Sequence, residues 1–228
     1  MIPLLLLHGA LGSADQLAPL RRILNESKPA VHSLNFSGHS GEAFSASGFG
    51  IDIFAHDILT FLNKGEIPVV DIFGYSMGGY VALWFAFNYP ERVNRIITLG
   101  TKFDWSPTSA EKEIRKLDPE KIQLKIPAFA RILEHRHTPN DWKEVLQKTS
   151  SMMIDLGNKP LLTEDILRRT ETKTIIALGD QDDMADRSYS KYVSEIIPSG
   201  KFVLLENTPH PIEKVDLNRI VKLISEES

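Results

Sequence analysis

Short apolar segments alternate along the chain with segments whose apolar residues recur every three or four positions. This alternation is typical of βα units built on a parallel sheet. Several of the apolar segments have no polar alternation, which is expected for strands that helices cover on both faces. The predicted strands are Ile2–Leu7, Val31–Phe36, Val69–Phe73, Arg95–Leu99, Thr174–Leu178 and Lys201–Leu205.

Three segments have the pattern of helices that cover this sheet. Ile51, Phe54, Ile58 and Phe61 share one helical face. The segment from Met77 to Tyr89 is apolar almost all round, which predicts a buried helix that ends at Pro90. The tail from Pro211 to Ile224 also presents an apolar face.

The alternation stops between Thr101 and about Lys173. Helix-like segments follow one another there without a convincing strand, and prolines separate them. We interpret the region of about residues 102–172 as a helical cap inserted between two strands of one domain that spans residues 1–228. The alternative is a set of ordinary connecting helices that cover a sheet face. The segments are Ala110–Leu117, Ala128–His135, Asp141–Asp155 and Glu164–Arg169.

Composition narrows the classes of partner. The chain has 228 residues and a net charge of −4, so it can bury a core without cross-links and has no basic surface for nucleic acid. It contains no cysteine, which excludes disulfides, thiolate metal sites and cysteine nucleophiles. We see neither a signal peptide nor an apolar stretch long enough for a membrane span. We expect a cytoplasmic protein without a membrane partner, and the oligomeric state stays open.

The strongest chemical motif is Gly74-Tyr75-Ser76-Met77-Gly78-Gly79. It follows a predicted strand and opens a predicted helix. Small residues on both sides of the serine permit a sharp turn that presents its hydroxyl at the carboxyl end of the strand. The backbone N–H of Met77 would then point toward a developing oxyanion. This pattern predicts that Ser76 is a catalytic nucleophile.

A serine nucleophile needs a base and a carboxylate that orients the base. Of the seven histidines, only His210 follows a late predicted strand. Three aspartates, Asp180, Asp182 and Asp183, follow the strand before it, and spacing within the chain alone leaves the choice among them open. The loop His8-Gly9-Ala10-Leu11-Gly12-Ser13 follows the first strand, so the N–H of Ala10 is the candidate second oxyanion donor.

Together these motifs resemble the α/β-hydrolase superfamily over essentially the whole chain. His8-Gly9 resembles the family's oxyanion loop, and Pro209-His210-Pro211 resembles its histidine loop. The segment from Asn35 to Ser40 resembles a shortened D-x-x-G-H-G-x-S turn, with Asn35 in place of the usual aspartate. The resemblance implies an α/β fold with a mostly parallel sheet of about six strands. It also favours Asp182 as the acid, because relatives place theirs three residues after a glycine such as Gly179.

Comparison with the family's motifs also argues against two of its reactions. Menaquinone-pathway lyases of the family carry an arginine where this chain has Tyr80, and haloalkane dehalogenases use an aspartate in place of Ser76. We therefore predict a serine hydrolase, of the carboxylic-ester class, that cleaves a small acyl ester or thioester without a cofactor. A carbon–carbon bond hydrolase or lyase with the same triad, or a ligand-sensing receptor of the same fold, remain the alternatives.

The cap supplies the predicted substrate pocket. We expect apolar side chains of the cap, together with Tyr75 beside the nucleophile, to surround the acyl group. Two histidines in His135-Arg136-His137 point apart on a helix, so no metal site is predicted there. The charged residues Lys112, Glu113, Arg115, Lys116, Glu120 and Lys121 are interpreted as a solvated face. The cap residues of the predicted pocket are Phe103, Trp105, Phe129, Leu133 and Trp142.

Overall fold

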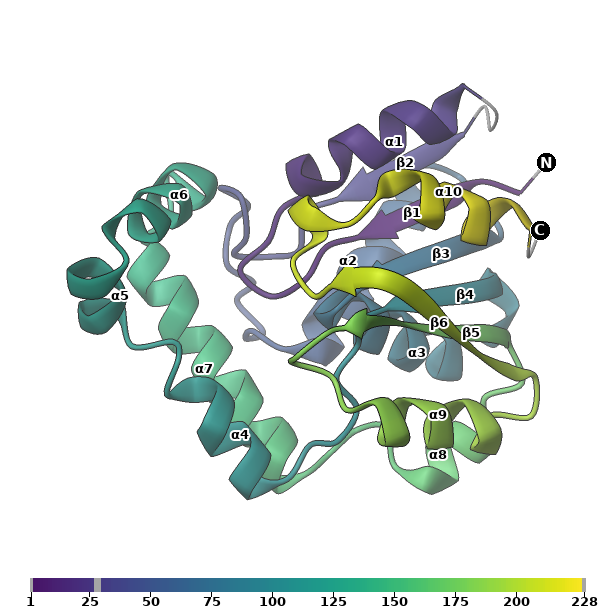
Figure 1. Cartoon of the computed structure of the whole chain (residues 1–228). Coiled ribbons are helices and arrows are strands. Elements are labelled where there is room, and N and C mark those ends of the chain that lie inside the picture. Colours follow the sequence, from purple (N-terminus) through teal and green to yellow (C-terminus); the bar gives the residue numbers. More distant parts are fainter. Residues whose placement is uncertain (1, 27–29, 227–228) are drawn as a thin grey trace.

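The computed structural model describes residues 2–26 and 30–226. Within them lies one six-stranded sheet in the order β2-β1-β3-β4-β5-β6, and every pair of neighbouring strands is parallel. Figure 1 shows the twisted sheet with helices on both of its faces. The strands are β1 (Leu4–Leu7), β2 (Val31–Leu34), β3 (Val70–Tyr75), β4 (Val93–Leu99), β5 (Lys173–Gln181) and β6 (Gly200–Pro209). The predicted fold class is confirmed.

The two faces of the sheet pack into two separate cores. Successive side chains of a strand point to opposite faces, so Leu5 and Leu7 of β1 enter one core while Leu4 and Leu6 enter the other. All four leucines are essentially inaccessible to solvent. A strand buried on both faces has no polar alternation, and this is why β1 is a plain run of leucines.

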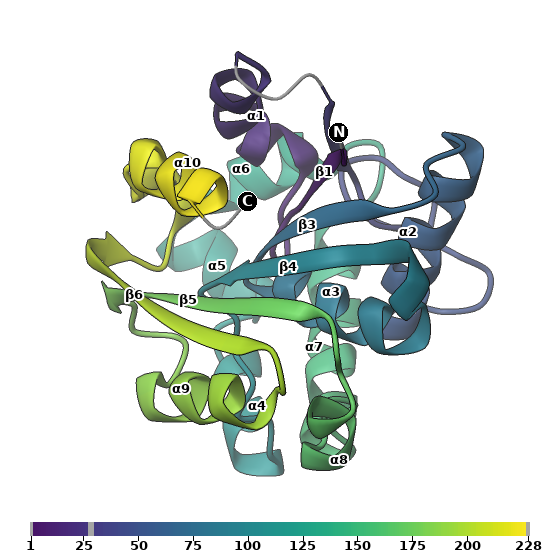
Figure 2. The same ribbon diagram turned by 90° about the vertical axis from the view of Figure 1, so that its right-hand side faces the viewer.

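The first core lies under α2 (Ile51–Lys64), α3 (Met77–Asn88) and α9 (Arg187–Ile196). The second lies under α1 (Ala18–Asn25) and α10 (Leu217–Glu226). Figure 2 shows α1 and α10 on one side of the sheet and α2 and α3 on the other. The short 3-10 helices η1 (Ala14–Leu17), η2 (Pro90–Arg92) and η3 (Ile212–Lys214) complete the connections.

Between β4 and β5 the chain forms five helices. Four of them stand away from the sheet, as Figure 1 shows, and we call these four the cap helices. Leu133, Trp142, Val145 and Leu146 belong to a third, small core, which Leu11 of the loop after β1 also joins. The cap helices are α4 (Pro107–Ile114), α5 (Pro119–Lys125), α6 (Pro127–His137) and α7 (Trp142–Asn158). The fifth helix, α8 (Glu164–Arg168), packs beside α9 at the sheet rather than with the cap helices. The limits of the cap as a structural unit, residues 102–172, stay a prediction.

Several helices were not predicted from the sequence. The segments that form α1, α5 and α9 are only eight, seven and ten residues long, so any apolar periodicity in them extends over three helical turns or fewer. Strand β6 continues past the predicted Leu205 to Pro209. This extension places His210 directly after the strand. Among the described residues, no helix combines the length and apolarity that crossing a bilayer requires.

Candidate active site

Ser76 occupies the sharp turn between β3 and α3. Its backbone has φ 52° and ψ −118°, outside the regions that L-residues prefer. Two bonds stabilise this conformation: the Ser76 N–H donates to Leu99 O at 2.8 Å, and the Thr101 hydroxyl donates to Ser76 O at 2.9 Å. A strained residue held by its surroundings is a feature of functional sites, and the sharp strand-to-helix turn is the one that the sequence predicted around Ser76.

Gly74 makes this turn possible by allowing a close backbone approach. A Cβ atom at Gly74 would lie 2.5 Å from the Cα and N atoms of Gly79. Such a distance is a steric clash, so a side chain at position 74 would push the first turn of α3 away from β3. The glycines of the motif therefore have the packing role that the sequence predicted for them.

His210 and Asp182 contact each other at the carboxyl edge of the sheet. The Nδ1–H of His210 donates to Asp182 Oδ2 at 2.7 Å, and both side chains are buried. The other carboxylate oxygen, Oδ1, accepts the backbone N–H groups of Met184 and Ala185 at 2.9 and 3.0 Å. Burial raises the pKa of Asp182, but the bonds from His210 and the backbone outweigh it, so the pKa lies below its usual value. Asp182 is therefore a fixed carboxylate.

The other two aspartates of this loop have different surroundings. Asp180 lies in β5 and accepts the Thr208 N–H of β6 at 3.0 Å, a bond that lowers the pKa of its carboxyl. Asp183 is exposed. Of the three candidates, Asp182 is the one whose carboxylate meets the His210 ring.

Gly100 is a site residue that the sequence analysis missed. It follows β4 with φ 64°, and a Cβ atom there would lie 2.9 Å from Asp182 Oδ2 and 3.2 Å from His210 Nδ1. The Asp182–His210 pair therefore packs directly on the backbone of position 100. A glycine directly after a predicted strand is a weak sequence signal, because only the fold brings it against the residues that follow β5 and β6.

The predicted oxyanion donors flank Ser76. Ala10 follows β1 and Met77 is the first residue of α3, and both line the same cavity as Ser76. A Cβ atom at Gly9 would lie 3.2 Å from Ser76 Cβ, so the loop after β1 passes close to the serine.

His8 fixes the start of the loop after β1. Its ring is fully buried, its Nδ1–H donates to Gly9 O at 2.8 Å, and its Nε2 accepts the Phe36 N–H at 3.2 Å. Burial lowers the pKa of His8 to about 4, so the ring is neutral near pH 7. Asn35 Oδ1, where the family's turn usually has aspartate, accepts the Ala14 N–H at 2.7 Å.

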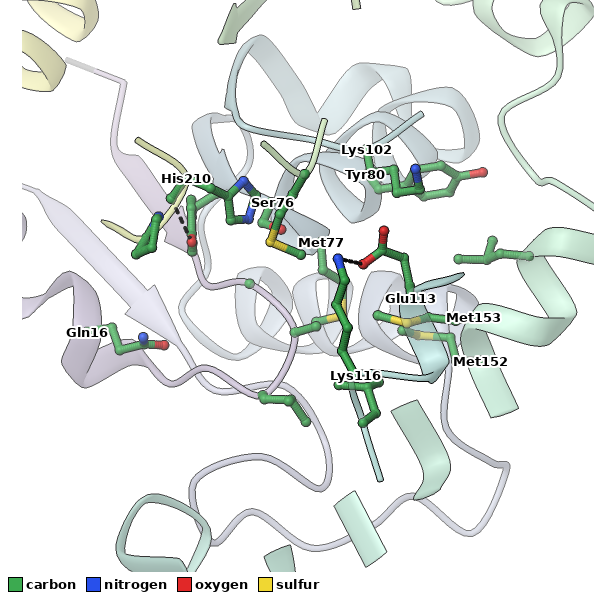
Figure 3. Close-up of a pocket in the computed structure, with 18 of the residues that line it drawn as sticks. Gln16, Ser76, Met77, Tyr80, Lys102, Glu113, Lys116, Met152, Met153 and His210 are labelled. Atoms are coloured by element: carbon green, nitrogen blue, oxygen red, sulfur yellow. Dashed lines mark hydrogen bonds and ion pairs between the residues drawn. The ribbon is translucent and has the colours of Figure 1, made fainter. Parts of the chain in front are cut away.

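A cavity of about 660 Å³ lies between the sheet edge and the cap helices. Figure 3 shows Ser76 and His210 next to one another at one end of it, with Met152 and Met153 toward the other. Most of the lining is apolar. The apolar lining residues include Leu11, Ile51, Met77, Leu117, Ile126, Ile132, Met152, Met153, Leu156 and Met184.

Half of the six residues predicted for the substrate pocket line this cavity. Tyr75, Trp105 and Phe129 do so, and the Tyr75 hydroxyl donates to His210 O at 3.0 Å. Phe103, Leu133 and Trp142 do not. Phe103 packs near Tyr80 in the core under α3, with ring centroids 6.4 Å apart. Leu133 and Trp142 are buried in the small core of the cap helices, because they face their own helix neighbours.

The charged segment 112–121 is not a uniformly solvated face, which corrects the sequence interpretation. Lys112, Arg115, Glu120 and Lys121 are exposed. Glu113, however, is buried, lines the cavity and forms an ion pair with Lys116 at 2.8 Å (Figure 3). The spacing of three between the two residues brings them together on α4 and its end.

The histidines of α6 point apart, as their spacing predicted. His135 is exposed and His137 is fully buried. Within the described part of the chain, no three histidine, aspartate or glutamate side chains gather as a metal site would require.

The sequence was compared with models of known protein families. Residues 2–153 match the profile of the α/β hydrolase fold family. Because this match covers more than half of the chain, the protein belongs to the α/β hydrolase fold family, as the motifs and the sheet indicated.

Individual relatives are distant. Lipase 1 of Psychrobacter immobilis is 24% identical over 227 residues, which is 91% of this chain and 71% of the lipase. A probable alcohol acetyltransferase of Cyberlindnera fabianii is 28% identical over 99 residues, which is 43% of this chain. This match spans about a quarter of the acetyltransferase, 27% of its length.

Solved structures show the same fold. A thermophilic esterase from Thermogutta terrifontis superposes with a TM-score of 0.77 at 18% identity, over 100% of this chain and 89% of the esterase. A meta-cleavage product hydrolase from Pseudomonas fluorescens superposes with a TM-score of 0.76 at 20% identity, over 99% of this chain and 90% of that one.

Proposed function

We propose that the protein is a serine hydrolase that cleaves an acyl ester or thioester with Ser76 as nucleophile. The observation that carries this proposal is the 2.7 Å bond between His210 Nδ1 and a buried Asp182 carboxylate, in a cavity that Ser76 also lines. A Nδ1–H committed to Asp182 leaves the lone pair of His210 on Nε2, where a base for the serine is needed.

The reaction follows from these groups. Ser76 Oγ bonds to the substrate carbonyl carbon as its proton passes to His210 Nε2. The carbonyl oxygen becomes an oxyanion that accepts the N–H groups of Ala10 and Met77. Collapse of this intermediate breaks the carbonyl–oxygen or carbonyl–sulfur bond, and His210 returns the proton to the leaving group. Water then attacks the acyl-enzyme, with His210 again as base, and Ser76 is released. Asp182 stabilises the charged imidazole in both steps.

The cavity supports the proposed class of substrate. A lining that is apolar over most of its area favours an acyl chain of hydrocarbon character over a sugar or a nucleotide. Two of the similar proteins are a lipase and an esterase, and their names support the proposal of an ester substrate. A small acyl-bearing substrate, the absence of a cofactor and a cytoplasmic location belong to the same proposal.

Labelling with a fluorophosphonate tests the nucleophile. We expect one adduct on Ser76, located by mass spectrometry, and no adduct in Ser76→Ala or His210→Ala. A folded wild-type protein without label on Ser76 contradicts the proposal. Turnover of 4-nitrophenyl esters of two to ten carbons then gives the acyl length.

A substrate panel separates the proposed reaction from its alternatives. Turnover of a vinylogous 1,5-diketone but of no ester would identify a carbon–carbon bond hydrolase. One slow turnover that leaves product bound would identify a ligand sensor.

A further inference from the structure

The loop after β1, residues 9–12, is held by the last turn of α6. Leu11 has φ 57°, a left-handed conformation that costs a non-glycine residue about 1–2 kcal/mol. Its carbonyl oxygen accepts two hydrogen bonds from the cap helices, from Arg136 Nη1 at 2.8 Å and from His137 Nε2 at 3.2 Å. The two donors are more than a hundred positions away along the chain, and nothing in local sequence predicts these bonds.

The protonation state of His137 fits this role. Its Nδ1 accepts the Ser40 N–H at 3.2 Å, so the ring proton resides on Nε2 and is donated to Leu11 O. Burial, with the neighbouring Arg136 charge, lowers the pKa of His137 to about 4. The neutral ring therefore joins the loop after β2 to the loop after β1.

Arg136 extends the connection to the histidine loop. Its Nη2 lies 3.9 Å from Glu213 Oε1, three residues after His210. The same Glu213 oxygen accepts the Gln16 side-chain amide, and Gln16 in turn accepts the Ser13 N–H at 3.1 Å. The end of α6 thus contacts both loops that carry predicted catalytic groups.

We propose that Arg136 and His137 are positioning residues that hold the oxyanion loop in its catalytic conformation. The inference rests on the proposed function, since it concerns the N–H of Ala10, the residue before Leu11. Without its two donors, the strained Leu11 peptide can relax, and the Ala10 N–H rotates away from the oxyanion. Because the donors belong to the cap helices, the oxyanion donor forms fully only when α6 is seated on the loop.

The test compares three arginine variants on a neutral 4-nitrophenyl ester. For Arg136→Ala we expect kcat to fall roughly 10–100-fold with KM within about a factor of two, because the loss acts on the transition state. Arg136→Lys keeps a donor within reach of Leu11 O and should recover part of kcat. Arg131→Ala is the matched control, since Arg131 is an exposed arginine of the same helix.

Several results would overturn the inference. An unchanged kcat in folded Arg136→Ala, or a fall in melting temperature alone, would mean a structural role. A rise in KM confined to esters with an anionic acyl group would mean that Arg136 binds substrate instead. If Arg136→Ala does not fold, two variants of His137 test the proposal instead. The side-chain amide of His137→Gln can still donate to Leu11 O, so its kcat should exceed that of His137→Leu. Equal kcat values for the two variants contradict the proposal.

The failures of the two proposals are distinguishable. If the wild-type protein neither labels at Ser76 nor turns over esters, the proposed function is wrong and the positioning role has no reaction to serve. If the wild type is active and all Arg136 and His137 variants match it, only the positioning role is wrong.

Discussion

The cavity has two walls that differ in construction. The wall at the sheet edge carries Ser76 and His210, with Asp182 hydrogen-bonded to His210. Each of the three residues follows a strand of the sheet and is fixed by backbone hydrogen bonds or packing. The wall of the cap helices carries flexible apolar side chains, and part of it remains open: Ile126 lines the cavity and is 53% exposed, while nearby Leu124 is 81% exposed.

This difference separates two tasks. Bond making and breaking depend on positions within a fraction of an ångström, which strands and their turns can hold. Recognition of an acyl chain depends on apolar area and tolerates side chains that adapt, such as methionine. A change in the sheet wall should therefore act on kcat, and a change among the apolar side chains of the cap wall should act on KM.

The largest effect is expected at the sheet wall. Asp182→Asn keeps the size of the side chain but removes the charge that selects the Nδ1–H tautomer of His210. In serine hydrolases this change lowers kcat by about 10⁴. Steady-state kinetics on a 4-nitrophenyl ester measures it. Asp183→Asn, an exposed neighbour in the same loop, is the control and should retain wild-type kcat. Equal activity of both variants would remove Asp182 from the triad.

An intermediate effect is expected where the two walls meet. His8, His39 and His137 are buried there. The ring centroid of His39 lies 5.0 Å from that of His8 and 5.7 Å from that of His137. Burial lowers the pKa of His8 and His137 from 6.5 to about 4, and that of His39 also falls. The unfolded chain therefore binds protons below pH 6.5 that the folded chain does not, so stability falls as the pH drops from 6.5 to 4.

Urea unfolding at several pH values measures this slope. His39→Phe removes one titrating ring and keeps the stack on Phe49, whose centroid lies 5.3 Å away. We expect a shallower loss of unfolding free energy as the pH falls from 6.5 to 4, because burial lowers the pKa of His39 and the variant lacks this group. His56→Gln, at an exposed histidine, should keep the wild-type slope. If unfolding free energy depends on pH as steeply in His39→Phe as in the wild type, His39 does not contribute to the loss of stability at low pH.

The smallest effect is expected at the cap wall. Met153 lines the cavity from α7, so Met153→Ala removes apolar contact with a long acyl chain. A loss of about 1 kcal/mol of binding corresponds to roughly fivefold in KM, with kcat unchanged. Ile154→Ala changes the next residue, which is 42% exposed and outside the cavity lining, and should leave KM unchanged. A fall in kcat for Met153→Ala with constant KM would mean that the two walls do not divide the tasks.

The fold class, the nucleophile and the base could be predicted from local features of the sequence. The strand pattern and the turn around Ser76 depend on residues within a few positions of one another, and His210 follows its strand directly. Such short-range relations are visible in one chain because backbone sterics act locally. Asp182 needed more: three aspartates fit the local pattern, and the resemblance to known hydrolases favoured the one that contacts His210.

Tertiary structure alone decided the rest. Leu133 and Phe129 lie on the same helix. Leu133 is fully buried in the cap core, whereas Phe129 packs against that core and also lines the cavity, because the packing of α6 on its neighbours selects the face. Gly100 under the Asp182–His210 pair, and Arg136 on the carbonyl of Leu11, join segments far apart in sequence. Periodicity identifies which residues can be buried, but only the assembled fold determines what they are buried against.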